Sequence, residues 1–220
     1  MISTFITATN TNIGKTFAST LLIERLKSKY STLKISALKP IETGVKEIPE
    51  DAKLLLKALQ GNEDKTDLSL KDLTLFKFEL PASPFVASGG ARVDIEQIKS
   101  RIKNLKDSVD ILIVEGAGGL MVPINIDYFM IDLIQDVADL TLLITPSKLG
   151  SINETLLSIE ALERRGINFD WCVNLKEEDR EDFEQITAPF YRDYFGSFWE
   201  LTRDIESFLE RFVLINHQSY

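Results

Sequence analysis

The chain has 220 residues, of which 44% are hydrophobic and 27% are charged, and its formal net charge is −9. This composition is typical of a globular protein with a large apolar core, and we expect one domain over residues 1–220. Lysines and arginines are scattered, so no basic face is expected for a nucleic acid. Because the chain has no apolar stretch of membrane-helix length and no signal-peptide pattern in its N-terminus, MISTFITAT, we expect no membrane partner and a cytoplasmic protein.

The single cysteine and the single histidine limit the chemistry that the chain can perform. Cys172 lies in the apolar run 169–173, where it can form neither an internal disulfide nor a multi-cysteine metal site, and we expect it in the core. His217 lies in the polar tail 216–220, far from the motifs described below. Catalysis that depends on an imidazole is therefore not expected.

Apolar runs rich in β-branched residues alternate with amphipathic stretches along the chain. The predicted strands are 3–8, 33–38, 111–115, 140–145 and 169–173. The predicted helices are 15–30, 51–59, 95–105 and 151–164. This alternation is typical of βαβ units and predicts an α/β fold, with a mostly parallel central sheet and helices on both faces. The C-terminal region, 188–220, is atypical: it is rich in aromatic residues and ends in a helical pattern over 205–214.

A phosphate-binding loop is the strongest local signal. Residues 8–16, ATNTNIGKT, follow a predicted strand and open a predicted helix, which is the context that a Walker A loop requires. Only the first position departs from the pattern, since Ala8 replaces a glycine. Gly14 lets the backbone approach a phosphate, Lys15 can neutralise β- and γ-phosphate oxygens, and Thr16 can hold Mg²⁺. We therefore expect a P-loop NTPase-like fold, with an ordinary strand-to-helix turn as the alternative.

Two acidic residues and a second lysine are candidates to act beside this loop. Glu115 ends a predicted strand at the same edge of the sheet and precedes a glycine-rich stretch, 116–119, which either approaches a ligand or forms a turn. Asp51 begins a predicted helix, so it is either a metal ligand or an acid that favours the helix dipole. Lys39 follows the second strand, where it either reaches the site or is solvated.

Four sequence blocks, taken in this order, resemble the dethiobiotin synthetase family. They are 9–16 (TNTNIGKT), 38–44 (LKPIETG), 114–119 (VEGAGG) and 148–153 (KLGSIN). The similarity extends from Met1 to about Lys176 and includes 81–84 (PASP). It implies a Mg²⁺- and ATP-dependent ligase of biotin biosynthesis that converts 7,8-diaminononanoate and CO₂ into dethiobiotin, ADP and phosphate, through a carbamate and a carbamic-phosphoric anhydride. It also implies a homodimer with the substrate site at the interface.

The resemblance assigns roles to particular residues. Lys15 and Lys39 would flank the transferring phosphoryl group as catalytic residues, and Mg²⁺ would be bound by Thr16, Asp51 and Glu115. The residues implied to contact the nucleotide with its metal are Asn12, Ile13, Gly14, Lys15, Thr16, Phe17, Asp51, Glu115, Gly116, Ala117, Gly118 and Asn174. The residues implied to contact the diamine or its carbamate are Thr11, Thr43, Gly150, Ser151, Ile152 and Asn153. For Gly150 and Asn153, helix capping is the alternative.

The part of the chain that would cover the nucleotide base departs from the family. Many relatives have a Gly-x-Ile-Pro-like segment that closes over adenine, whereas residues 194–200 read YFGSFWE and lack that proline. The base pocket is therefore expected to be open or differently built, and a preference for ATP over other nucleoside triphosphates is not predicted. Asn174 is either a base contact or a strand-end residue.

Two other functions share parts of this pattern. A nucleotide-driven switch or partitioning ATPase acts through a protein partner, but such proteins carry a lysine early in the phosphate loop, where this chain has Asn10. A synthetase resembling the synthetase half of cobyrinic acid amidation would usually need a glutaminase domain with a nucleophilic cysteine, and Cys172 lies inside a predicted strand. Phosphoryl transfer needs no protein nucleophile, so loss of Lys15 or Lys39 is expected to reduce turnover far more than it alters folding.

Overall fold

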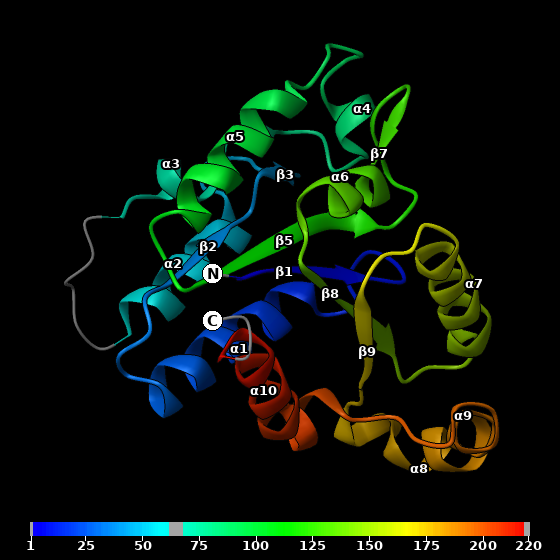
Figure 1. Cartoon of the computed structure of the whole chain (residues 1–220). Coiled ribbons are helices and arrows are strands. Elements are labelled where there is room, and N and C mark those ends of the chain that lie inside the picture. Colours follow the sequence, from blue (N-terminus) through cyan, green and yellow to red (C-terminus); the bar gives the residue numbers. More distant parts are fainter. Residues whose placement is uncertain (1, 62–67, 218–220) are drawn as a thin grey trace.

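The computed structural model describes residues 2–61 and 68–217, with side chains up to residue 210, and contains a five-stranded parallel sheet (Figure 1). Its strands are β1 (Ile2–Ala8), β2 (Ile35–Leu38), β5 (Ile111–Gly119), β8 (Leu140–Pro146) and β9 (Phe169–Asn174). They lie in the order β2-β5-β1-β8-β9, which places β1 in the centre. All the predicted strands are present, and the parallel α/β fold is confirmed.

Helices cover both faces of this sheet, as Figure 1 shows. One face packs against α1 (Lys15–Lys29), α2 (Glu50–Gln60) and α10 (Leu201–His217). The other packs against α5 (Ile95–Lys106), α6 (Met130–Val137) and α7 (Ser151–Arg164). Strand β8 is buried along its whole length because its side chains alternate between the two cores: Leu142 and Ile144 enter the first, and Leu143 enters the second.

The predicted helices are found as α1, α2, α5 and α7, each within one residue of its predicted ends. Several shorter elements were not predicted, because two to eight residues are too few for a periodic pattern. Besides α6, they are α3 (Leu70–Leu73), α4 (Pro84–Ala87), β3 (Ile41–Thr43), β4 (Phe76–Phe78), β6 (Pro123–Asn125), β7 (Tyr128–Phe129), η1 (Glu177–Asp179), α8 (Arg180–Asp182), η2 (Phe183–Thr187) and α9 (Ala188–Phe195). Across residues 2–61 and 68–217, no helix has the length and apolar character needed to cross a membrane.

The glycine-rich stretch 116–119 continues β5 and does not form a turn. Gly119 pairs with Ala8 across an irregularity in the β1–β5 register. A Cβ atom at Gly119 would lie 3.0 Å from the carbonyl oxygen of Thr9, a tight contact that glycine avoids where the end of β5 passes the start of the phosphate loop. The glycines therefore allow close backbone packing beside the loop.

The atypical C-terminal region covers the outer edge of the sheet. Tyr191 of α9 is fully buried, and its ring lies 5.2 Å from that of Trp171 in β9. Beyond α9, the backbone N–H of Val173 donates to the carbonyl oxygen of Trp199 over 3.0 Å, which partly pairs the edge of β9. Cys172 is buried in the core, as predicted, whereas the side chain of His217 lies outside the described residues.

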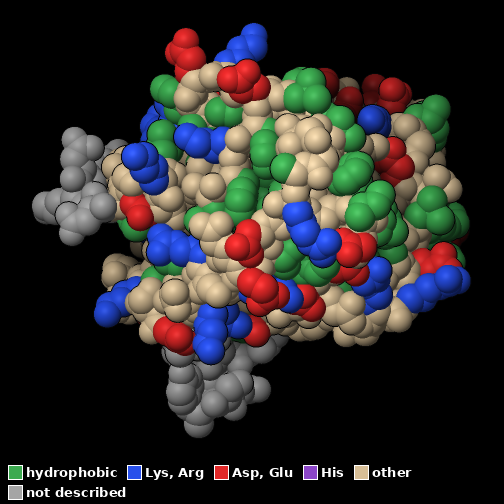
Figure 2. Space-filling view, turned by 90° about the horizontal axis from the view of Figure 1, so that it is seen from above, with side chains coloured by type: hydrophobic (Ala, Val, Ile, Leu, Met, Phe, Trp, Pro, Cys, Tyr) green, Lys and Arg blue, Asp and Glu red, His purple; other side chains and the backbone are tan. Residues whose placement is uncertain are grey.

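The charged side chains are mixed by sign on the surface. On the face of the molecule shown in Figure 2, lysine and arginine side chains are dispersed among acidic and hydrophobic ones. This face is therefore chemically mixed, in line with the scattered charges of the sequence.

Asp139 ties together three elements at the amino end of the sheet. Its Oδ2 accepts hydrogen bonds from the backbone N–H of Ser3 at the start of β1 and from Nζ of Lys106 at the end of α5, each over 2.7 Å. Partial burial alone would raise the pKa of Asp139, but the hydrogen bonds from Lys106 and Ser3 outweigh it and lower this pKa. The ionised carboxylate therefore stabilises the fold.

We expect Asp139→Asn to lower the free energy of unfolding by about 1 kcal/mol at pH 7, because the ion pair is partly exposed to solvent. Since the folded pKa is depressed, the stabilisation is fully present above the unfolded pKa of about 4 and is lost as pH falls through the folded pKa. Urea unfolding followed by circular dichroism should therefore show wild type and variant converging toward pH 3. Asp107→Asn, at an exposed position, is the control; an equal deficit at pH 7 and pH 3 would contradict this account.

Candidate functional site

The phosphate loop connects β1 to α1 and is curved by left-handed backbone at Asn12 (φ 61°) and Gly14 (φ 103°). A Cβ atom at Gly14 would lie 2.3 Å from Nδ2 of Asn174, which donates to the carbonyl oxygen of Ile13 over 2.9 Å. Glycine is therefore required there on both counts. Among the described side chains none caps α1, so the N–H groups of its first turn are available to an anion.

Lys15 lies at the base of this loop. Its Nζ donates to the carbonyl oxygen of Asn10 over 3.1 Å, and only 7% of the residue is exposed. Burial, followed by the positive charge of Lys39, lowers the pKa of Lys15 to about 8, although Glu115 and Asp51 act in the opposite direction. A phosphate bound here would therefore stabilise the protonated form of this lysine.

Lys39 joins two carboxylates in a buried ion-pair cluster. Its Nζ lies 2.7 Å from Oε1 of Glu115 and 2.8 Å from Oδ2 of Asp51, and it donates to the carbonyl oxygen of Gly116 over 3.0 Å. Burial lowers the pKa of Lys39, but the two carboxylates outweigh it and raise this pKa overall. Burial raises the pKa of Asp51, and Lys39 with Thr16 more than reverses that effect. Lys39 is thus charged and tied to both acids.

The oxygens around Thr16 fit a divalent cation. Its Oγ1 lies 2.8 Å from Oε1 of Glu115 and 2.9 Å from Oδ1 of Asp51, yet one hydroxyl proton can serve only one of them. Oε2 of Glu115 is buried and has no hydrogen-bond partner among the described residues. A cation that shares these oxygens would satisfy both groups.

This donor set suits a metal that is shared with a nucleotide. Within the described parts of the chain, no group of three or more His, Cys, Asp or Glu side chains could hold a metal ion by itself. Mg²⁺ at phosphate-transfer sites usually takes one or two carboxylates and completes its shell with phosphate oxygens and water. Asp51 and Glu115 with Thr16 provide such a partial set.

A cavity of ≈530 Å³ opens in front of this cluster and collects most of the predicted site residues. Its walls are formed by Thr11, Asn12, Gly14, Lys15, Thr16, Lys39, Glu42, Thr43, Gly44, Glu50, Asp51, Ala117 and Gly118. A neighbouring cavity shares Thr11 and Thr43 with it and adds an apolar wall from residues 81–84 and Val122. The predicted phosphate, metal and diamine residues near the loop are therefore brought together, and Glu42, which the sequence analysis did not single out, lies among them.

A second cavity of ≈530 Å³ lies on the other side of the loop. It is lined by Asn12, Ile13, Gly14, Phe17, Pro146, Ser147, Lys148, Asn174, Leu175, Lys176, Glu177, Glu178, Asp179 and Thr202. Residues 194–200, which were expected near the base, do not line it. At the end of this segment, Trp199 and Glu200 instead pair with Val173 at the edge of β9. The wall beside Asn174 is formed by the acidic segment 177–179. The role of Asn174 in base binding stays a prediction, since its amide nitrogen already supports the loop.

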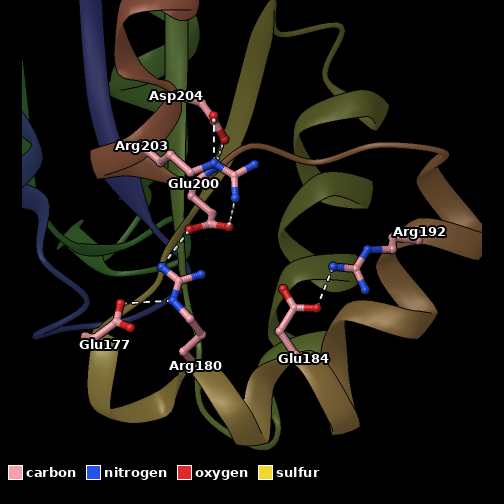
Figure 3. A network of polar contacts seen from close by, with 7 residues as sticks. All are labelled: Glu177, Arg180, Glu184, Arg192, Glu200, Arg203 and Asp204. Carbon is pink, nitrogen blue, oxygen red and sulfur yellow. Dashed lines mark hydrogen bonds and ion pairs between the residues drawn. The ribbon is translucent and has the colours of Figure 1, made fainter.

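Glu200 is linked through Arg180 to Glu177, which is one residue of this wall (Figure 3). Its side chain is only 4% exposed and accepts from Nη2 of Arg180 over 3.1 Å and from Nη1 of Arg203 over 3.0 Å. Arg180 in turn donates through Nε to Oε2 of Glu177 over 2.9 Å. The C-terminal region is thereby linked to the segment that lines the second cavity.

The predicted substrate segment 150–153 lies apart from these cavities, none of which it lines. The hydroxyl of Ser151 is fully buried and receives a long hydrogen bond, 3.4 Å, from the hydroxyl of Tyr191. The residue as a whole is buried, and its backbone N–H donates to the carbonyl oxygen of Lys148 over 3.2 Å. The segment begins α7, whose first turn has no side-chain cap among the described residues, and its predicted role stays a prediction.

Comparison with known proteins gives consistent sequence matches. A protein-family model described as AAA domain matches residues 3–198. The ATP-dependent dethiobiotin synthetase BioD of Sulfurovum sp. is 46% identical over 209 residues, which cover 94% of this chain and 98% of that protein. The protein of the same name from Wolinella succinogenes is 40% identical over 92% of this chain and 94% of its own length. Its namesake from Methanocaldococcus jannaschii is 41% identical over 74% of this chain and 75% of its own.

Solved structures share the fold at low sequence identity. The MinD cell division protein of Aquifex aeolicus matches with a TM-score of 0.55 and 17% identity, covering 94% of this chain and 86% of that one. A ParA family ATPase of Chlorobium tepidum matches with a TM-score of 0.54 and 12% identity, covering 90% and 82%. At such identities the likeness concerns the fold alone, and it confirms the P-loop NTPase-like architecture.

Because Lys39 is buried in an ion-pair cluster, we expect its replacement to lower the stability of the fold as well as the activity. Lys39→Met would leave Glu115 buried without its cation, so we expect the free energy of unfolding to fall by about 3 kcal/mol, in addition to any loss of turnover. Lys15→Met should have a smaller effect, since the Nζ of Lys15 donates only to a carbonyl oxygen among the described contacts. Urea unfolding in the presence of EDTA measures both.

Added Mg²⁺ should stabilise Lys39→Met more than it stabilises wild type, because the two carboxylates no longer have their ammonium partner. The double variant Lys39→Met/Glu115→Gln should be more stable than Lys39→Met alone, since the unpaired buried charge is gone. Equal stability of Lys39→Met and wild type in EDTA would show that the ion-pair cluster contributes nothing to the fold.

Proposed function

This chain belongs to the dethiobiotin synthetase family, and we propose that it forms dethiobiotin, ADP and phosphate from 7,8-diaminononanoate, CO₂ and ATP. The observation that carries this proposal is one cavity in which a phosphate loop, Lys15, Lys39 and Asp51 meet two threonines, Thr11 and Thr43, with Glu115 buried behind Lys39 and Thr16. Such a set provides for phosphate binding and for a small polar acceptor, and the proposed route requires no protein nucleophile.

The loop and its lysines provide the positive environment for phosphoryl transfer. The N–H groups at the start of α1 would bind phosphate oxygens, and Lys15 would neutralise those nearest the transferred group. Lys39, held between Glu115 and Asp51, would keep a second positive charge beside them. Mg²⁺ held by Thr16, Asp51 and Glu115 would offset charge on the nucleotide phosphates.

The proposed reaction has three bond-forming steps, in each of which the protein positions the reacting groups. One amine of the substrate attacks CO₂, forms a carbon–nitrogen bond and loses a proton, which gives a carbamate. A carbamate oxygen attacks the γ-phosphorus of ATP, and the bond to ADP breaks. The second amine then attacks the carbonyl carbon of the carbamic-phosphoric anhydride and loses a proton, and phosphate leaves with that carbamate oxygen. The protein's task is to align these groups and stabilise their negative charge.

We further propose a cytoplasmic homodimer in which a second copy completes the substrate site. The apolar wall of residues 81–84 and Val122 suits the carbon chain of the diamine. The uncapped start of α7 suits a carboxylate but does not line the cavities at the loop of its own chain. Leu149 (80% exposed) and Leu157 (58%) beside it are large apolar side chains, as at a protein interface.

Release of ADP by the purified protein should require both 7,8-diaminononanoate and bicarbonate in the presence of ATP and Mg²⁺. We expect Lys15→Ala to reduce this rate about 10²–10³-fold, the usual effect of removing one group that stabilises transition-state charge. Lys103→Ala, at an exposed position on α5, should leave it unchanged. A coupled ADP assay makes the measurement. A rate that is the same without the diamine would favour a nucleotide switch instead.

A further inference from the structure

Glu42 is a buried acid whose side chain accepts hydrogen bonds from the start of helix α2. It lies in β3, is only 5% exposed and lines the cavity in front of the phosphate loop. Its Oε1 accepts from the backbone N–H of Asp51 over 2.9 Å, and its Oε2 accepts from that of Ala52 over 3.1 Å. The carboxylate therefore uses both oxygens on the first turn of α2.

This arrangement replaces an ordinary helix cap. Residue Pro49 occupies the N-cap position of α2 and has no side-chain group that could accept a hydrogen bond. Glu42 supplies the missing acceptor from outside the helix, and its negative charge is favourable at a helix N-terminus. Because two bonds from one rigid carboxylate meet two successive N–H groups, they fix the rotation of the helix as well as its position.

The same helix turn carries a residue of the candidate metal site. The backbone of Asp51 is held by Glu42, while its side chain reaches Oγ1 of Thr16 and Nζ of Lys39. Lys39 lies three residues before Glu42 in the chain, and its backbone N–H donates to the carbonyl oxygen of Leu73 over 2.7 Å. One anchored segment, 39–42, thus orients both the lysine and the helix that provides its partner.

We propose that Glu42 is a positioning residue, which holds α2 so that the carboxylate of Asp51 is oriented for Mg²⁺ bound with the nucleotide. This inference rests on the proposed function, in which Asp51 is a metal ligand. Residues that orient metal ligands usually change metal affinity or activity about 10–100-fold when they are replaced. If Glu42 were a cap with a purely structural role, its replacement would lower the free energy of unfolding and leave metal binding unchanged.

The test compares Glu42→Ala with Asp94→Ala. Asp94 is another carboxylate cap, which accepts a hydrogen bond from the backbone N–H of Gln97 at the start of α5 and is not part of the candidate site. Binding of Mn²⁺ to the protein–ADP complex is measured by electron paramagnetic resonance, and binding of ADP alone is measured in EDTA by calorimetry. We expect Glu42→Ala to weaken Mn²⁺ binding about 10–100-fold and to leave metal-free ADP binding unchanged. Asp94→Ala should change neither, although it too lowers the melting temperature.

Glu42→Gln separates orientation from charge. It has the same length but offers one acceptor oxygen, so it should recover part of the Mn²⁺ affinity that Glu42→Ala loses. The proposal would be overturned if Glu42→Ala bound Mn²⁺ as tightly as Asp94→Ala does. It would also be overturned if Glu42→Gln bound Mn²⁺ as weakly as Glu42→Ala does. If Glu42→Ala does not fold, Glu42→Gln decides alone: weaker Mn²⁺ binding with unchanged metal-free ADP binding supports it, and unchanged Mn²⁺ binding overturns it. Wild type that binds no Mn²⁺ with ADP would instead overturn the metal site itself.

Discussion

The carboxylate of Glu115 is fully buried where β5 meets the phosphate loop, and a charge without solvent is stable only where cations and donors surround it. Lys39 and Thr16 meet this requirement from the segment after β2 and from the start of α1. Asp51 joins the same cluster from α2. The sheet edge, the loop and the first turn of α2 are therefore fixed relative to one another by one set of charges, which is also the set that phosphoryl transfer needs.

The two lysines of the site have different surroundings, and this division suits the proposed chemistry. Lys39 is bound to carboxylates, so its charge is compensated before any ligand arrives. Lys15 binds a carbonyl oxygen, and burial lowers its pKa to about 8, so the phosphate of a ligand would be its first full counter-charge. Binding of a nucleotide thus satisfies Lys15, whereas Lys39 contributes to the fold as well as to the site.

Sequence patterns predicted the parts of the molecule that depend on local order. Buried strands and long amphipathic helices have recognisable periods, and the loop 8–16 has a motif whose context was correct. Glu42 was missed because its partners lie nine and ten residues away and no pattern marks a cap from another strand. The wall at 177–179 was missed for a similar reason, since it depends on Glu200, which lies more than twenty residues further along the chain. The burial of Ser151 against Tyr191 was not predicted either, because it depends on tertiary packing between residues forty positions apart.

If the γ-phosphoryl group is transferred to a carbamate made from CO₂, as proposed, one oxygen of that CO₂ must leave in the phosphate, and oxygen labelling can detect it. The enzyme would be mixed with ATP, Mg²⁺, 7,8-diaminononanoate and C¹⁸O₂ in ordinary water, and the reaction would be stopped before hydration of CO₂ exchanges its label with water. The phosphate formed would then be analysed by mass spectrometry. Since phosphate leaves with a carbamate oxygen, one ¹⁸O atom should appear in each phosphate formed. Unlabelled phosphate, released at the same rate as dethiobiotin, would exclude phosphoryl transfer to a carbamate.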